Sequence, residues 1–202
     1  MLKLGEMKVL KINSSAAKGT SISRNEVEAI ISEILAKYPN AKVTDRDVAY
    51  DNLPFPDDTF VDAIFHQGEL NEEQQKAIQL SDNLVNEFME SDILVIGAPM
   101  YNFGIPACLK AYFDLVARAG KTFQYSEQGY PVGLVENKKA IIAITTGGVS
   151  LGSPMDFSKG YISTFLGFLG IRDIEFIELD ENRFRYEEKR KMANEKLASI
   201  FQ

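Results

Sequence analysis

The sequence predicts an α/β domain built on a doubly wound, five-stranded parallel sheet with helices on both faces. Three observations predict this fold class. Strand-like and helix-like segments alternate along the chain, which is typical of βαβ units. The run from Ile93 to Gly97 is continuously apolar, as a strand covered on both faces requires. A length of 202 residues with 45% hydrophobic content suits one core, so we expect a single domain over residues 1–202.

The first half of the chain is expected to supply three strands and two helices. Between Ser23 and Tyr38, apolar residues recur at the spacing of one helix face, and Pro39 ends the helix. Ala49 to Leu70 reads as a long connection. The expected elements are a strand at Met7–Ile12, the helix Ser23–Tyr38, a strand at Ala41–Val48, a helix at Asn71–Glu90 and the buried strand Ile93–Gly97.

The second half is expected to complete the sheet with two more strands. A helical stripe of apolar side chains begins near Ile105 and ends near Gly120. The remaining expected elements are a strand at Lys139–Thr145, a helix at Tyr161–Leu169, a strand at Ile174–Leu179 and a closing helix at Tyr186–Ile200. Ligands of such sheets bind beyond the carboxyl ends of the strands, so the loops at that edge matter most.

Composition excludes several kinds of chemistry. The chain has 22 Lys and Arg against 29 Asp and Glu, a net charge of −7, and we expect no nucleic-acid partner. One cysteine (Cys108) and one histidine (His66) make a metal site and Ser-His or Cys-His catalysis improbable. Apolar stretches are too short to span a bilayer, so a soluble, cytoplasmic protein without a membrane partner is expected. A borrowed cofactor would have to supply the reactivity of an enzyme of this composition.

The loop after the first strand, Asn13 to Ser23, is rich in hydroxyl groups and leads directly into a helix. A helix N-terminus offers unpaired N–H groups and a positive dipole end, which suit a phosphate. The alternative is a plain helix cap, since Ser23 and Glu26 have capping-box spacing. The loop lacks both the Walker lysine pattern and G-x-G-x-x-G, so a terminal monophosphate fits better than a triphosphate or dinucleotide.

Two further loops should emerge at the same edge. Met100 to Phe103 follows the buried strand and combines aromatic surface with the donor and acceptor of Asn102, which suits a flat ring with a polar edge. Gly147 and Gly148 follow the fourth strand and would allow positive φ and close approach of the backbone to a ligand. Each loop alone could be an ordinary turn with core aromatics. Three of them at one edge indicate a mononucleotide with a planar ring.

Longer motifs carry a family resemblance. The segments APMYNF (98–103), YFDLVARAG (112–120) and STFLGF (163–168) resemble the FMN-dependent NADH-azoreductases, flavodoxin-like enzymes that reduce azo dyes and quinones. The similarity extends from the first strand to the last helix. The resemblance implies a flavodoxin-like fold, FMN as cofactor, NADH or possibly NADPH as electron donor, an azo or quinone acceptor, and a homodimer with its active sites near the subunit interface.

The resemblance also implies site residues. The FMN phosphate and ribityl chain would be held by Ser15, Ser21, Ile22 and Ser23. The isoalloxazine ring would lie between Met100, Tyr101, Asn102 and Phe103 on one side and Thr145, Thr146, Gly147 and Gly148 on the other. Candidates for aromatic contacts lent across the dimer interface are Phe60, Tyr125 and Phe168. No side chain acts as an obvious acid or base, and Asn102 would support the reduced ring by hydrogen bonding.

Two departures from the family pattern concern substrate preference. Many relatives have Ser-Arg-Gly-Gly where this chain has Thr145 to Gly148, so a cationic side chain is missing, and the His that often follows is replaced by Val149 and Ser150. Two other functions remain open at this point: a flavodoxin-type electron carrier without substrate turnover, and a flavin-free binding module. The segments Ala49–Leu70 and Gly120–Gly133 look like walls of a substrate pocket, which favours the enzyme.

Overall fold

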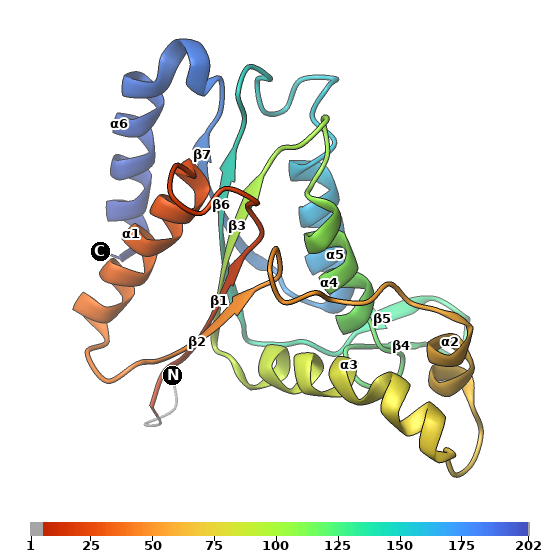
Figure 1. Ribbon diagram of the computed structural model, residues 1–202. Helices are drawn as coiled ribbons and strands as arrows, with labels where there is room; N and C mark the ends of the chain where they lie inside the picture. Colours follow the sequence, from red (N-terminus) through yellow and green to blue (C-terminus); the bar gives the residue numbers. More distant parts are fainter. Residues whose placement is uncertain (1–5, 202) are drawn as a thin grey trace.

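A computed structural model describes residues 6–201 of the chain (Figure 1). Its main sheet contains five parallel strands in the order β2-β1-β3-β6-β7, so the predicted doubly wound sheet is confirmed. The strands are β1 (Lys8–Asn13), β2 (Lys42–Asp47), β3 (Ile93–Pro99), β6 (Lys139–Thr145) and β7 (Asp173–Leu179). Every residue of β3 is buried, as the continuous apolar run predicts for a central strand.

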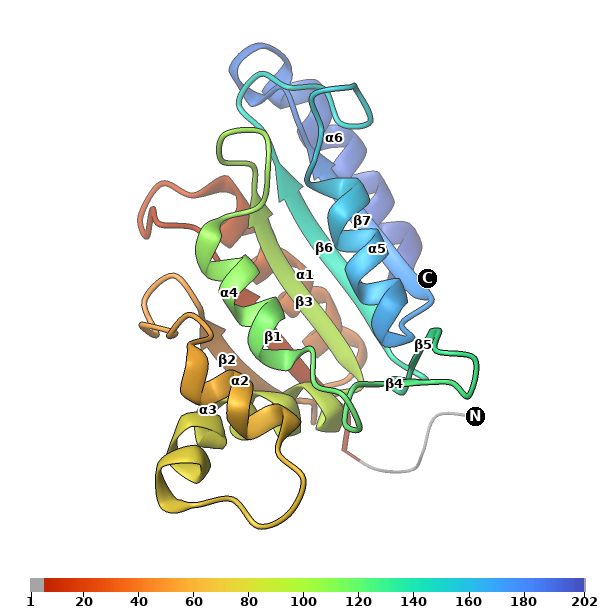
Figure 2. The same cartoon turned by 90° about the vertical axis from the view of Figure 1, so that its right-hand side faces the viewer.

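Helices cover both faces of this sheet (Figures 1 and 2). One face packs against α1 (Ile22–Lys37) and α6 (Asn182–Phe201), whose buried side chains form one core with alternate residues of β1, β3, β6 and β7. The opposite face packs against α3 (Glu72–Glu90), α4 (Ala107–Val116) and α5 (Lys159–Leu169), which form the larger core. Because successive strand residues point to opposite faces, each strand contributes to both cores.

The structure adds three features that the sequence pattern does not reveal. The connection after β2 contains a short helix, α2 (Asp58–Phe65), capped by the Asp57 side chain. The segment after α4 folds into an antiparallel hairpin of β4 (Phe123–Tyr125) and β5 (Pro131–Gly133). The closing helix begins at Asn182 rather than Tyr186, with a kink at Arg185. The short elements α2, β4 and β5 have too few residues for a reliable periodicity, and Pro54 and Pro56 lie just before α2.

The strand order creates a switch point between β1 and β3. From β1 the chain crosses to β2 on one side, whereas β3 lies on the other side, so the loops after β1 and β3 diverge from neighbouring strand ends. In doubly wound sheets this crevice is where ligands bind. The loops that follow β1, β3 and β6 are therefore the expected ligand-binding segments of this fold.

Candidate functional site

The loops after β1, β3 and β6 meet at the carboxyl edge of the sheet, as expected. Direct hydrogen bonds join the first two: the Ser14 hydroxyl donates to Gly97 O at 2.6 Å, and the Tyr101 hydroxyl accepts from Ala16 N–H at 3.1 Å. The second and third loops are joined by Met100 N–H, which donates to Thr145 O at 2.7 Å. These contacts fix the three loops into one arrangement.

The loop after β1 presents the N-terminus of α1. Ser21 is the N-cap and accepts a hydrogen bond from Arg24 N–H, and the hydroxyls of Ser21 and Ser23 lie 3.1 Å apart. Within residues 6–201, no protein acceptor pairs with the N–H groups of Ile22 and Ser23. The first turn carries no acidic residue, so its positive dipole end is uncompensated there. Hydroxyls and free N–H groups together make a suitable phosphate cradle.

The capping box of Ser23 and Glu26, the alternative to a phosphate site, does not form. The cap is Ser21, two residues earlier, and the Glu26 side chain turns into the protein interior, where it pairs with Arg190 of α6. Glu26 is fully buried, and burial raises the pKa of its carboxyl despite the neighbouring guanidinium. Tertiary packing against α6 therefore overrides the local capping preference.

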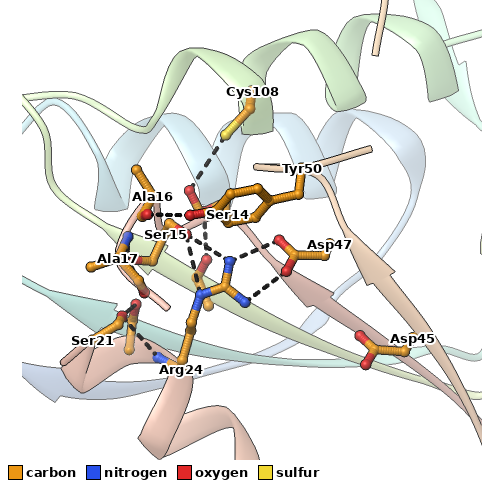
Figure 3. Close-up of polar contacts among 12 residues, drawn as sticks. Ser14, Ser15, Ala16, Ala17, Ser21, Arg24, Asp45, Asp47, Tyr50 and Cys108 are labelled. Carbon is orange, nitrogen blue, oxygen red and sulfur yellow. Dashed lines mark hydrogen bonds and ion pairs between the residues drawn. The ribbon is translucent and has the colours of Figure 1, made fainter. Parts of the chain in front are cut away.

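An arginine clamp holds the loop after β1 in shape (Figure 3). The Arg24 guanidinium donates two hydrogen bonds to Ser15 O, at 2.6 and 3.2 Å, and two to the Asp47 carboxylate, at 2.7 and 2.9 Å. The hydrogen bonds that Arg24 donates to Asp47 raise the pKa of the Arg24 guanidinium, so the clamp stays charged. The Tyr50 hydroxyl donates to Ala16 O at 2.5 Å. Sequence reasoning missed these residues, although the position of Asp47 at the end of a strand was a usable signal.

The single cysteine lies beneath the same loop. Cys108 stands in the first turn of α4, and its Sγ donates to Ser14 O at 3.4 Å (Figure 3). Burial raises the pKa of the thiol, which keeps it protonated and suits packing rather than nucleophilic chemistry.

The loop after β3 is a tight turn with unusual backbone angles. Tyr101 and Gly104 exchange two backbone hydrogen bonds, and between them Asn102 and Phe103 both have positive φ, 50° and 72°. Residues with side chains rarely adopt this conformation, and such strain gathers at functional sites. The turn leaves Tyr101 40% and Phe103 49% exposed, and the Asn102 side chain makes no hydrogen bond within residues 6–201. An aromatic surface and a free amide thus face outward together.

The loop after β6 is fixed by its buried threonines. The Thr146 hydroxyl donates to Val149 O and accepts from Glu181 N–H at the start of the α6 segment. Gly147 and Gly148 follow on the exposed side. Neither glycine adopts the positive φ that a glycine allows. Their backbone lies open to a ligand, so the absence of a side chain, rather than the left-handed conformation, is their distinguishing feature.

The three aromatic candidates for the substrate pocket lie elsewhere in the subunit. Phe60 on α2 is only 5% exposed and belongs to the core, with the Arg118 guanidinium over its ring. Phe168 packs on Phe123 with ring centroids 4.6 Å apart, near the end of α5, where the chain turns back toward the amino edge. Tyr125 on β4 is 63% exposed. The structure therefore does not bring them together with Met100 to Phe103, and Phe60 cannot be an exposed interface residue as placed.

The hairpin segment Gly120–Gly133 likewise lies at the amino edge rather than beside the three loops. Just beyond the hairpin, Leu134 N–H donates a hydrogen bond to Thr122 O, and Val135 N–H donates one to Leu169 O. Leu169 ends α5, shortly before the amino end of β7 at Asp173. A cavity of about 1040 Å³ opens there between the hairpin and α5, lined in part by Lys138, Phe168 and Arg172. The Lys138 ammonium donates to Met89 O and Ser91 O at the end of α3, and burial lowers its pKa to about 8. This lysine serves the packing of α3.

Across residues 6–201, His, Cys, Asp and Glu side chains nowhere gather in a group of three or more that could hold a metal ion. Over that same range, no helix combines the length and apolar character needed to cross a membrane.

The residues present fit a flavin mononucleotide. The cradle at the start of α1 suits one phosphate, because the N–H groups of Ile22 and Ser23 have no partner among residues 6–201. The amide of Asn102 in the strained turn and the exposed backbone at Gly147 are polar groups that a planar ring could contact at its edges. Tyr101 and Phe103 add apolar surface beside them. FMN contains one nucleotide, so the single phosphate cradle is sufficient for it.

Comparisons with known proteins agree with this geometry. Residues 7–201 match a family described as having a flavodoxin-like fold. The FMN-dependent NADH:quinone oxidoreductase 1 of Hahella chejuensis is 44% identical over 174 residues, which cover 86% of this chain and 84% of that protein. The FMN-dependent NADH:quinone oxidoreductase of Thiobacillus denitrificans is 39% identical, covering 97% and 95% of the two chains.

Solved structures give the same result. The azoreductase from Bacillus anthracis strain Sterne superposes with a TM-score of 0.85 at 28% identity, covering 96% of this chain and 97% of that one. Azoreductase AzrA has a TM-score of 0.84 at 27% identity, with the same coverage.

Proposed function

This chain belongs to the flavodoxin-like family that includes the FMN-dependent NADH:quinone oxidoreductases, and we propose that it performs that reaction. It is an FMN-dependent oxidoreductase that takes electrons from NADH and passes them to quinones or azo compounds. The observation that carries this function is the meeting of three loops at the carboxyl edge, with a phosphate cradle on one and a strained aromatic turn on the next. No side chain of the site is an evident acid or nucleophile.

Each loop has a distinct role in the proposed site. Bound FMN supplies the redox chemistry, because it accepts a hydride from the nicotinamide and returns two electrons to the acceptor. Ser15, Ser21, Ile22 and Ser23 hold its phosphate and ribityl chain. Met100 to Phe103 and Thr145 to Gly148 enclose its ring, and Asn102 hydrogen-bonds the ring's polar edge. Backbone N–H groups are fixed donors, so they stabilise developing negative charge without reorganisation.

Donor and acceptor would visit the one proposed flavin site in turn, so we expect ping-pong kinetics. The donor is NADH rather than NADPH in this proposal, since the sequence shows no arginine cluster that would grip a 2′-phosphate.

The assembly and location form part of the same proposal. Residues 1–202 make one domain that acts as a homodimer, with Tyr125 among the exposed aromatics available for the interface. Sedimentation should give twice the chain mass at micromolar concentration, and a monomer would refute the shared interface. NADH is an intracellular metabolite, which supports a cytoplasmic enzyme.

An anaerobic titration tests the function. NADH alone should bleach the absorbance of the oxidised flavin, and a quinone or azo dye added afterwards should restore it without more nicotinamide. Metal chelators should change neither step. If NADH fails to bleach the flavin while dithionite does so readily, the protein is an electron carrier of the flavodoxin type instead. If the purified protein binds no flavin, the assignment fails altogether.

A further inference from the structure

The loop between β7 and α6 runs beside the glycine loop at the rim of the site. Backbone hydrogen bonds join the two: Asn182 N–H donates to Thr146 O at 3.1 Å, and Arg183 N–H donates to Gly147 O at 2.9 Å. Figure 1 shows both segments at the top of the molecule, where α6 begins and the chain leaves β6. The backbone therefore fixes where Arg183 and Phe184 stand relative to the glycines.

The side chains of Arg183 and Phe184 lie against Gly147 and Gly148, respectively. A Cβ added at Gly147 would be 3.5 Å from Arg183 Nε, and one added at Gly148 would be 3.4 Å from Phe184 Cε2. These are van der Waals distances, so a guanidinium and a phenyl ring flank the two residues proposed to border the flavin ring. Neither glycine needs its flexibility for a positive φ.

Arg183 is a cation without a carboxylate partner. Within residues 6–201 no Asp or Glu lies within ion-pair distance of it, whereas Arg185, two residues along, is paired with Glu181 and Glu188. The chain carries a net charge of −7, so most of its surface repels anions. An unpaired guanidinium at the rim is thus a place where an anionic substrate group gains a charge-assisted hydrogen bond.

Phe184 adds an apolar ring beside the unpaired guanidinium of Arg183 at the rim of the site. Its ring is 77% exposed, so it is accessible to a ligand at the rim. Because Arg183 and Phe184 lie against adjacent glycines, one small ligand at this rim can contact both side chains. The matching ligand is an aromatic ring with its anionic group attached directly. In NADH a ribose separates the adenine from the phosphates, so the match is to an acceptor.

We propose that Arg183 and Phe184 form a subsite that selects aromatic acceptors bearing a carboxylate or sulfonate. Arg183 binds the anionic group, and Phe184 contacts the ring. The inference rests on the proposed function, because the acceptor must reach the flavin beside Gly147. It also provides this chain with a cationic group near the glycine loop, where Thr146 is buried and its hydroxyl is bonded to Val149 O and Glu181 N–H.

The test compares 4-carboxyazobenzene with its methyl ester as acceptors, with NADH as donor. Arg183→Gln should lower kcat/KM for the carboxylate about tenfold and change the value for the ester by less than about twofold, as expected for one charge-assisted contact. Arg185→Gln is the matched control, since it removes the same charge from the same segment and should not discriminate between the two acceptors. Phe184→Leu should lower kcat/KM for both acceptors by a similar factor.

A binding measurement supplies a readout independent of turnover. The dissociation constant of the unreactive 4-biphenylcarboxylate, measured by calorimetry with the FMN-loaded protein, should rise about tenfold in Arg183→Gln and not in Arg185→Gln. FMN content should be equal in all variants.

Three results would overturn the inference: equal losses for acid and ester in Arg183→Gln, no difference between the two arginine variants, or a loss confined to kcat/KM for NADH. Failure of the wild type to reduce either a quinone or the uncharged ester would instead refute the proposed function.

Discussion

Replacing Asp47 by Asn tests whether the arginine clamp shapes the phosphate cradle. The Asp47 carboxylate accepts two hydrogen bonds from Arg24, and the two side chains are largely shielded, 29% and 14% exposed. A charge-assisted contact of this kind contributes about 1–2 kcal/mol. Without it, Arg24 keeps only its bonds to Ser15 O, and the loop is held less firmly. If the lost contact free energy reduces FMN binding by the same amount, the Kd for FMN should rise about tenfold.

An opposing electrostatic effect must be weighed against this loss. Removing a carboxylate near a phosphate dianion favours binding, by about 1 kcal/mol for two charges 4 Å apart in water and less at longer range. Salt of about 0.15 M screens charges beyond about 8 Å. The positional loss should therefore prevail, and the loss of FMN affinity should grow as salt is added.

Fluorescence titration of the apoprotein with FMN measures the effect. Asp45→Asn is the matched control, because Asp45 stands on the same strand but pairs with Lys11 and does not touch the loop. Riboflavin lacks the phosphate, so its affinity should change little in either variant. If Asp47→Asn binds FMN as tightly as Asp45→Asn at about 0.5 M salt, where charges are screened within a few ångströms, the clamp does not position the cradle.

Four further outcomes follow from the structure. Gly148→Val should weaken FMN binding, because an added Cβ would lie 3.4 Å from Phe184 Cε2 and the valine methyl groups would have to displace the Phe184 ring. Unchanged FMN affinity in a folded variant would show that the glycine is only a turn residue. Asn102→Gly should slow flavin reduction in stopped-flow experiments without loss of stability, because glycine adopts a positive φ readily. Asn102→Ala should slow reduction too and should also lower the free energy of unfolding in urea by about 1 kcal/mol, because alanine disfavours the positive φ at this position. Tyr112→Phe should raise the free energy of unfolding by about 1 kcal/mol, since the Tyr112 hydroxyl is buried without a partner, and a destabilised variant would contradict that. The raised pKa of Glu26 gives the wild type a contribution to stability that is fully present below its unfolded pKa of about 4.3 and is lost as pH rises through the folded value. Glu26→Gln should therefore gain stability relative to the wild type as the pH rises above about 4.3, and a difference independent of pH would rule out the buried carboxyl as the cause.

Parts of the candidate site could be predicted from the sequence because they depend on local chemistry and strand order. Ile93 to Gly97 is apolar throughout, which requires a strand covered on both faces, and parallel strands place the segments that follow them at one edge. The hydroxyl-rich loop, the Met100–Phe103 turn and the glycine pair were therefore expected to meet, and they do.

Other parts depended on contacts between residues distant in the chain. Ser23 and Glu26 had capping-box spacing, yet Glu26 pairs with Arg190, 164 positions away. Phe60 looked like a pocket residue because it stands in a connection, but α2 folds it into the core. Asp47 and Arg24 are unremarkable charges until the sheet order brings β2 beside the loop after β1.

The sequence by itself determined the fold class, the three loops and the kind of cofactor, because hydrophobic periodicity, helix N-terminal chemistry and strand alternation are properties of nearby residues. Only the tertiary structure decided which side chains clamp the cradle, which aromatics are buried, and that Arg183 and Phe184 stand over the glycines. These are outcomes of packing between segments far apart in the chain, and the free energy of such contacts is set by partners that no local pattern identifies.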